Sequence, residues 1–76
     1  MGIYSNRYKA LSNKIKKARL ERGLDQTELA NQLGKTQSYI SKLEAGQIKV
    51  DVEILDILST LLNKPITYFF ENYKDK

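Results

Sequence analysis

The chain of 76 residues contains no cysteine and no histidine. Without these side chains it can form no disulfide, no thiolate nucleophile and no Ser-His-Asp triad, and almost every type of zinc site is excluded as well. The acidic residues are scattered, and none belongs to a calcium-binding loop or to a paired-carboxylate site. We therefore predict that the protein is not an enzyme and that it uses no metal or other cofactor.

Long hydrophobic runs are also missing. No apolar segment approaches the roughly 18 to 20 residues that are needed to cross a bilayer, and the N-terminal segment lacks the apolar core of a signal peptide. We therefore expect a cytoplasmic protein with no membrane partner. A chain of this length is expected to form one domain over residues 1–76 and to bury only about 60% of its unfolded surface, so a partner subunit would add stability.

The positive charge is concentrated in the N-terminal part of the chain. The net charge is +4. Residues 1–22 hold seven basic side chains against one acidic side chain, residues 23–50 hold three of each, and residues 51–76 hold three basic against five acidic. A basic segment attracts polyanions such as nucleic acids. A solvated surface helix has the same composition, so the charge alone does not decide between the two interpretations.

Apolar residues recur at helical spacing along most of the chain, and no strand pattern or repeat is present. Helices are expected over residues 6–22, 26–33, 37–45 and 52–62. A short fifth helix is expected over residues 65–72, because Pro65 suits the first turn of a helix. The predicted fold class is therefore an all-α domain of five helices.

Capping residues mark where these helices begin and end. Ser5 or Asn6 can cap the first helix, and Asp25 with Glu28 forms the pattern of a capping box before the second. The third and fourth helices have caps at Thr36 and Asp51. Gly34 can adopt the positive φ angle that ends the second helix. Residues 26–45 then form two short helices joined by a tight turn, which is typical of a helix-turn-helix.

The apolar faces of these helices predict the core. Ala30 is small enough to let the second and third helices cross closely, and the larger core residues of this pair are Leu29, Leu33, Ile40 and Leu43. The first helix contributes Tyr8, Leu11, Ile15 and Ala18. The fourth helix is apolar over a wide arc that suggests packing on more than one side, and this arc comprises Val52, Ile54, Leu55, Ile57, Leu58, Leu61 and Leu62.

Polar side chains remain on the outer face of the third helix, and they are suited to base edges and phosphates. They are Gln37, Ser38, Ser41 and Lys42. Gln37 can offer a bidentate pair to N6 and N7 of adenine, and it lies near the end of the helix that enters a major groove. Lys42 suits a phosphate or guanine. Each could also be an ordinary solvated side chain, and Tyr39 could lie along the DNA backbone or pack on a neighbour.

With these residues in place, the chain resembles the XRE family of bacterial and phage regulators, the lambda-repressor-like DNA-binding domains. The similarity covers about residues 15–70 and rests on Arg19, Gly23-Leu24, Gln26, Glu28-Leu29-Ala30, Leu33-Gly34, Gln37-Ser38-Tyr39-Ile40-Ser41, Leu43-Glu44, Gly46 and the tail from Pro65 to Phe70. The resemblance implies that Gln26 contacts a phosphate and that Gln37 reads a base. It also implies a structural ion pair between Arg19 and Glu44.

The chain departs from the family pattern at Lys35, Ile48 and Val50, of which Val50 replaces a proline that is common before the fourth helix. The other two departures bear on the predicted DNA contacts. Lys35 replaces an apolar residue, and we expect its stem to run along the turn with its ammonium free for a phosphate. Ile48 stands where a basic residue is frequent, which leaves Lys49 as the backbone contact. Thr36, like Gln26, lies at a helix start that favours a phosphate oxygen. The predicted DNA-binding residues are Gln26, Lys35, Thr36, Gln37, Ser38, Tyr39, Ser41, Lys42 and Lys49.

The C-terminal segment carries more apolar surface than the end of a small domain needs. The predicted homodimer contact comprises Ile66, Tyr68, Phe69, Phe70 and Tyr73, although Phe69 or Phe70 could instead fill the base of the core.

These residues together predict a sequence-specific regulator of transcription that binds double-stranded DNA as a homodimer on a pseudo-palindromic operator. The alternative is a protein-interaction module of the antitoxin or anti-repressor type that retains the same fold, and a protein effector stays open in either case. Binding of RNA or single strands is disfavoured, because beyond Tyr4 and Tyr8 no aromatic side chains alternate with the basic residues of the first helix.

Overall fold

The computed structural model describes residues 6–70, with side chains from Lys9 onwards. It contains the α-helices α1 (Asn6–Glu21), α2 (Gln26–Leu33), α3 (Gln37–Glu44) and α4 (Val52–Leu61), followed by a short 3₁₀ helix, η1 (Ile66–Phe70). No strand occurs between residues 6 and 70, which confirms the predicted all-α class. Within the same range, no helix has the length and apolarity that a membrane span requires.

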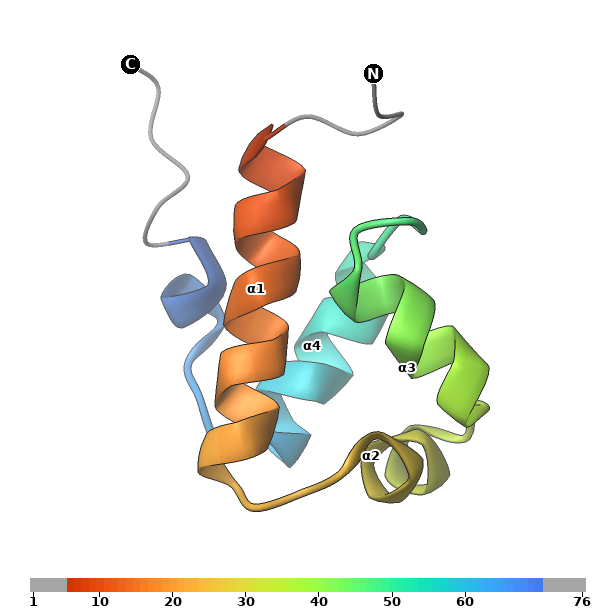
Figure 1. Cartoon of the computed structure of the whole chain (residues 1–76). Helices are drawn as coiled ribbons and strands as arrows, with labels where there is room; N and C mark the ends of the chain where they lie inside the picture. Colours follow the sequence, from red (N-terminus) through yellow and green to blue (C-terminus); the bar gives the residue numbers. More distant parts are fainter. Residues whose placement is uncertain (1–5, 71–76) are drawn as a thin grey trace.

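The helix α1 is the longest element and runs through the middle of the domain (Figure 1). η1 lies on one side of α1, and α3 lies on the other side beyond α4 (Figure 1). α2 packs against α3 and α4, while α1 packs against α3 and η1. One side of α3 therefore contacts the rest of the domain, and its opposite side is left at the edge of the molecule.

Apolar side chains from all five elements form one core. The buried residues are Leu11, Ile15, Ala18, Leu29, Ala30, Ile40, Leu43, Leu55, Leu58, Leu62 and Phe69. They include the predicted core positions of α2 and α3 apart from Leu33, which is partly buried at the margin. The side chain of Tyr8 lies outside the described side chains. The helical spacing of apolar residues thus identified most of the core correctly.

The prediction that α4 is buried over a wide arc is wrong for two residues. Val52 is 79% exposed and Ile57 is 38% exposed, whereas Leu55 and Leu58 are buried. Val52 is the first residue of the helix, and only one side of α4 packs against α2 and η1. Its apolar surface therefore continues onto the outside of the domain.

The predicted helix caps are confirmed wherever the structure describes them. The Asp25 carboxylate accepts from the Glu28 N–H at 2.7 Å while the Asp25 N–H donates to the Glu28 carboxylate at 2.8 Å, which is a capping box. Thr36 Oγ1 accepts from the Tyr39 N–H at 3.1 Å, and Asp51 accepts from the Ile54 N–H at 2.8 Å. The cap expected at Ser5 or Asn6 lies outside the described side chains.

The turn between α2 and α3 depends on Gly34. Its φ angle is +74°, and the Lys35 N–H donates to the Ala30 carbonyl at 2.8 Å, the hydrogen bond of a Schellman motif. Three residues separate the end of α2 at Leu33 from the start of α3 at Gln37. The position of α3 relative to α2 therefore depends on a backbone conformation that glycine adopts without strain.

Gly34→Ala is expected to lower the free energy of unfolding by roughly 1 kcal/mol, because a Cβ atom disfavours the left-handed region. Apart from Gly34 itself and its two chain neighbours, no residue comes within 4 Å of the position that this Cβ would take, so the loss should come from the backbone and not from a clash. Gly34→Asn is the matched control and should lose less, since asparagine tolerates this region. Urea unfolding followed by circular dichroism measures both, and equal losses would contradict the conformational explanation.

The fifth helix is tighter than the α-helix predicted over residues 65–72. Within the described residues it is a 3₁₀ helix over Ile66–Phe70, and the Tyr68 N–H donates to the Pro65 carbonyl at 2.9 Å. Residues 71 and 72 of the prediction lie outside the described part. All five residues of η1 are β-branched or aromatic, types that lose side-chain freedom in an α-helix. The short helix places Phe69 in the core.

η1 is held against α1 through Tyr68. The ammonium groups of Lys14 and Lys64 lie 4.4 and 4.7 Å from the centre of the Tyr68 ring. The Lys64 ammonium also forms an ion pair with Glu21 at 2.8 Å, and this contact lowers the pKa of the Glu21 carboxyl.

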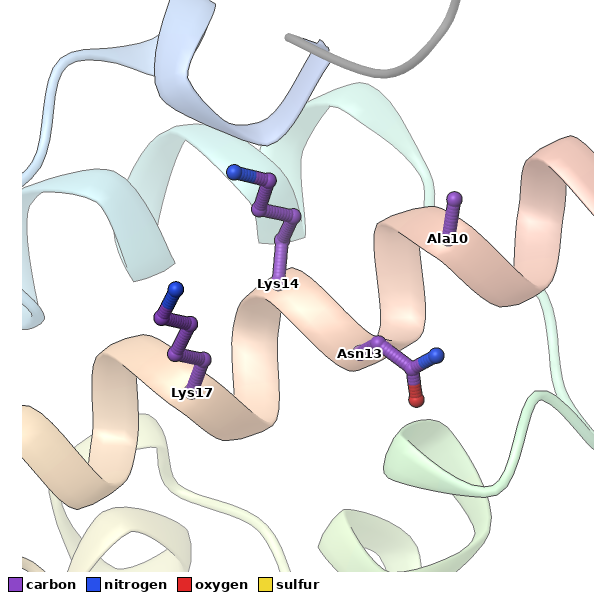
Figure 2. Close-up of a pocket in the computed structure, with 4 residues that line it drawn as sticks. All are labelled: Ala10, Asn13, Lys14 and Lys17. Carbon is purple, nitrogen blue, oxygen red and sulfur yellow. The ribbon is translucent and has the colours of Figure 1, made fainter.

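A surface pocket of about 230 Å³ lies along α1 and is lined by Ala10, Asn13, Lys14 and Lys17, whose side chains Figure 2 shows. None of these four residues belongs to the predicted DNA-binding set.

Candidate nucleic-acid interface

The helix α3 has a buried side and an exposed side. Ile40, Leu43 and Glu44 are buried. The exposed side chains follow one helical stripe, at positions 38, 41, 42 and 45, with Gln37 exposed at the start of the helix. The structure therefore brings Gln37, Ser38, Ser41 and Lys42 together on one surface, as the sequence predicted. The helix α3 that carries these residues lies at the edge of the domain (Figure 1).

The N-terminal end of α3 carries a cation and a hydroxyl. Lys35 is exposed, and its ammonium lies 5.1 Å from the centre of the Tyr39 ring, while its contact with a phosphate stays a prediction. Tyr39 packs partly against the core, the second of its two predicted positions. Burial and, to a lesser extent, the charge of Asp51 raise the pKa of the Tyr39 hydroxyl. The Thr36 hydroxyl oxygen accepts the capping hydrogen bond from the Tyr39 N–H, and its hydrogen can still be donated to another group.

The N-terminal ends of α2 and α3 differ in their electrostatics. α2 begins with the carboxylates of Asp25 and Glu28, which satisfy its capping box and place negative charge at its positive end. α3 begins with the neutral cap Thr36, next to the cation Lys35. Of the two helix N-termini, that of α3 is therefore the more favourable for a phosphate.

A buried ion pair joins α1 to α3. Arg19 Nε donates to Glu44 Oε2 at 2.6 Å, and Arg19 Nη2 donates to Glu44 Oε1 at 3.0 Å. Arg19 Nη1 also donates to the Leu24 carbonyl at 2.7 Å. Arg19 is 5% exposed and Glu44 is 8% exposed. The ion pair that the family resemblance implied is confirmed.

The ion pair continues into a chain of hydrogen bonds that the sequence did not reveal. Gln26 Nε2 donates to Glu44 Oε1 at 3.2 Å, and Gln37 Nε2 donates to Gln26 Oε1 at 2.6 Å. Gln26 and Gln37 stand 11 residues apart, and Gln26 and Glu44 stand 18 apart, on two different helices. No spacing rule within one helix relates such positions, so the sequence held no signal for these contacts.

The loop after α3 separates Lys49 from the helix start. Ile48 and Val50 are partly buried against the core, and Lys49 is exposed between them. The loop follows the C-terminal end of α3, whereas Gln37 begins the helix (Figure 1). Ile48 therefore packs against the core, and Lys49 is the exposed cation of this loop.

The C-terminal apolar residues divide between core and surface. Phe69 is 1% exposed and Tyr68 is partly buried, so neither offers the apolar surface that was predicted for a dimer contact. The alternative that Phe69 fills the core is the one that the structure confirms. Ile66 and Phe70 are 37% and 40% exposed. Tyr73 lies outside the described residues.

The fold and this surface define a helix-turn-helix protein, in which α2, the Gly34 turn and α3 form the characteristic pair. The model of the helix-turn-helix family matches residues 15–69, and the chain belongs to this family as an XRE-like member. Two curated relatives are HTH-type transcriptional regulators of Sinorhizobium medicae and Rhizobium meliloti, each 34% identical over 62 residues. The match covers 82% of this chain and 45% of each relative, so the chain spans less than half of their length.

Two solved structures share the fold. The restriction-modification controller protein C.AhdI from Aeromonas hydrophila is 26% identical with a TM-score of 0.80, and the match covers 87% of this chain and 100% of that one. The clp gene regulator ClgR from C. glutamicum is 25% identical with a TM-score of 0.77, and the match covers 83% and 82% of the two chains.

Proposed function

We propose that the protein is a cytoplasmic homodimer that binds duplex DNA sequence-specifically through α3 and regulates transcription. The observation that carries this proposal is the exposed polar stripe of α3, which stands opposite a buried side that anchors the helix in the core. Such a helix can enter a major groove while the rest of the domain supports it. The names of the curated relatives and of the two solved structures support the same class of function.

Each predicted side chain has a role in this proposal. Gln37 reads a base, and Ser38, Ser41 and Lys42 contact bases or phosphates further along the groove. The flanking contacts are made to the DNA backbone, by Gln26, Lys35, Thr36, Tyr39 and Lys49. Except for the partly buried Gln26 and Tyr39, all of these residues are exposed.

A homodimer would use the exposed apolar surface of α4 and η1. These two elements pack against each other, and the large apolar side chains that they expose are Val52, Ile57, Ile66 and Phe70. On the proposed operator, the two copies of α3 would lie about 34 Å apart in successive major grooves. A pseudo-palindromic operator follows from the two-fold symmetry of such a dimer.

Repeated selection of a randomised duplex pool on the purified protein tests the proposal. At about 150 mM salt, purely electrostatic binding is suppressed. We expect the selection to enrich an inverted repeat. An unenriched pool would contradict sequence-specific binding and favour the alternative, a protein-interaction module of the antitoxin or anti-repressor type.

Gln37→Ala and Lys42→Ala are expected to affect DNA binding differently. Loss of the Gln37 amide should reduce discrimination at one base pair by about 1 to 3 kcal/mol and leave the salt dependence nearly unchanged. Loss of the Lys42 ammonium should weaken binding to all sequences and reduce the salt slope by about 0.9 if its contact is a phosphate. Fluorescence anisotropy over a salt series with single-base variants of the operator measures both effects.

The control is Gln47→Ala, which removes an exposed glutamine amide outside the proposed contacts. It should bind as the wild type does. If Gln37→Ala and Lys42→Ala also bind like the wild type, the assignment of α3 as the recognition surface is wrong.

A further inference from the structure

We propose that Glu44 is a positioning residue for base recognition, because it determines through Gln26 which end of the Gln37 side-chain amide faces the DNA. This inference rests on the proposed reading of a base by Gln37. It is carried by one continuous chain of hydrogen bonds from Arg19 through Glu44 and Gln26 to Gln37, in which the distances lie between 2.6 and 3.2 Å.

The hydrogen bond between Gln26 and Glu44 can form in only one direction, with Gln26 as the donor. The Glu44 carboxylate accepts hydrogen bonds from Arg19 at both of its oxygens, and a carboxylate paired in this way has no hydrogen to donate. The group of Gln26 that faces Glu44 must therefore be the NH₂ group, as the 3.2 Å contact from Gln26 Nε2 shows.

The second link follows from the first. When the NH₂ group of an amide faces one partner, its oxygen faces away, and Gln26 Oε1 is turned toward α3. That oxygen can only accept, so Gln37 must present its own NH₂ group, at 2.6 Å. Gln37 is left with Oε1 and one N–H. This pair of an acceptor and a donor matches N6 and N7 of adenine.

The opposite polarity would favour a different base. If the Gln26 amide were reversed, its NH₂ group would take the Gln37 oxygen and leave both N–H groups of Gln37 for the DNA. Two donors match the acceptors O6 and N7 of guanine better than they match adenine. The polarity of the Gln26 amide would therefore select between two purines.

The chain is anchored at its buried end. Arg19 and Glu44 are buried, Gln26 is partly buried and Gln37 is exposed. Arg19 is itself held by the Leu24 carbonyl at 2.7 Å. Orientation is therefore imposed from the core toward the surface, and the exposed glutamine is the end that adapts.

Gln26→Leu tests this relay and keeps both residues of the Arg19–Glu44 ion pair. Gln37→Ala first identifies the base pair that Gln37 reads, and the ratio of affinities for adenine and guanine at that position is then measured for each variant. In Gln26→Leu we expect this ratio to fall by roughly 2- to 10-fold, the effect of losing one hydrogen bond. Loss of a phosphate contact by Gln26 would weaken all sequences equally and would not change the ratio.

Glu44→Gln tests the origin of the polarity. A glutamine at this position can turn either its oxygen or its NH₂ group toward Gln26, so the ratio should fall as it does in Gln26→Leu. Circular dichroism and thermal melting establish that the variant is folded. The matched control is Glu53→Gln, which removes the charge of an exposed carboxylate on α4 and should keep the wild-type ratio.

Exchange of the glutamine side-chain amide protons, measured by NMR on the free protein, gives a readout that does not depend on DNA. In the wild type, exchange at Gln37 should be slower than at the exposed Gln47, and in Gln26→Leu the two should become equal. If Glu44→Gln does not fold, this measurement and the ratio in Gln26→Leu decide the question.

The outcomes separate the relay from the function on which it rests. If Gln37→Ala changes no base preference, base reading by Gln37 is wrong and the role of Glu44 falls with it. If Gln37→Ala relaxes one position but a folded Gln26→Leu or Glu44→Gln keeps the wild-type ratio, the positioning role alone is overturned. A wild-type preference for guanine at that position would overturn it as well.

Discussion

Arg19→Met is expected to lower the free energy of unfolding by about 3 to 5 kcal/mol. The substitution keeps an unbranched apolar stem but leaves the Glu44 carboxylate buried without its counter-ion, and it removes the donor to the Leu24 carbonyl. An uncompensated charge in a low-dielectric interior is among the most destabilising single changes that a protein can carry. A small domain is stable by only a few kcal/mol more than this. Urea unfolding followed by circular dichroism measures the loss.

The double variant Arg19→Met with Glu44→Leu separates charge from packing. Because it removes both charges together, most of the stability should return, although the hydrogen bond to the Leu24 carbonyl stays lost. If the double variant is as unstable as Arg19→Met, the loss comes from packing and the unpaired-charge explanation is wrong. The double variant also lacks the anchor for Gln26, so recovered stability would not restore base discrimination.

Phe69→Ala is the second change with a large expected effect, a loss of about 3 to 5 kcal/mol. Phe69 is the only residue of η1 that is fully buried, and its ring packs edge-on against Tyr68 at 5.2 Å between centroids. Removing the ring leaves a cavity in the core and loosens the contact of η1 with α1 and α4. Thermal and urea unfolding of the purified variant measure the loss.

Phe70→Ala is the matched control, because it makes the same chemical change at the next position, where the side chain is 40% exposed. It should lose roughly 1 kcal/mol or less. If Phe70 lies in a dimer contact, this variant should also weaken self-association in sedimentation experiments, whereas the folded fraction stays high. Equal losses of stability in the two variants would contradict the division of η1 into a core side and a surface side.

The amino-acid sequence by itself determined the helices, their caps and most of the core. These features depend on residues within four positions of each other, such as Asp25 with Glu28, Thr36 with Tyr39, and the apolar positions of α1. Local spacing is visible in a sequence because the geometry of a helix turns it directly into a face or a capping hydrogen bond. For the same reason the polar outer face of α3 was predictable.

Only the tertiary structure decided which of two adjacent aromatic residues enters the core and which part of α4 stays exposed. Phe69 and Phe70 are the same type of residue at adjacent positions. The 3₁₀ geometry of η1 directs Phe69 into the core and leaves Phe70 exposed. The contact of Glu44 with Gln26, and of Gln26 with Gln37, likewise exists only because α2 packs across α3. Contacts between residues so far apart in the chain depend on how helices dock, and local periodicity carries no information about docking.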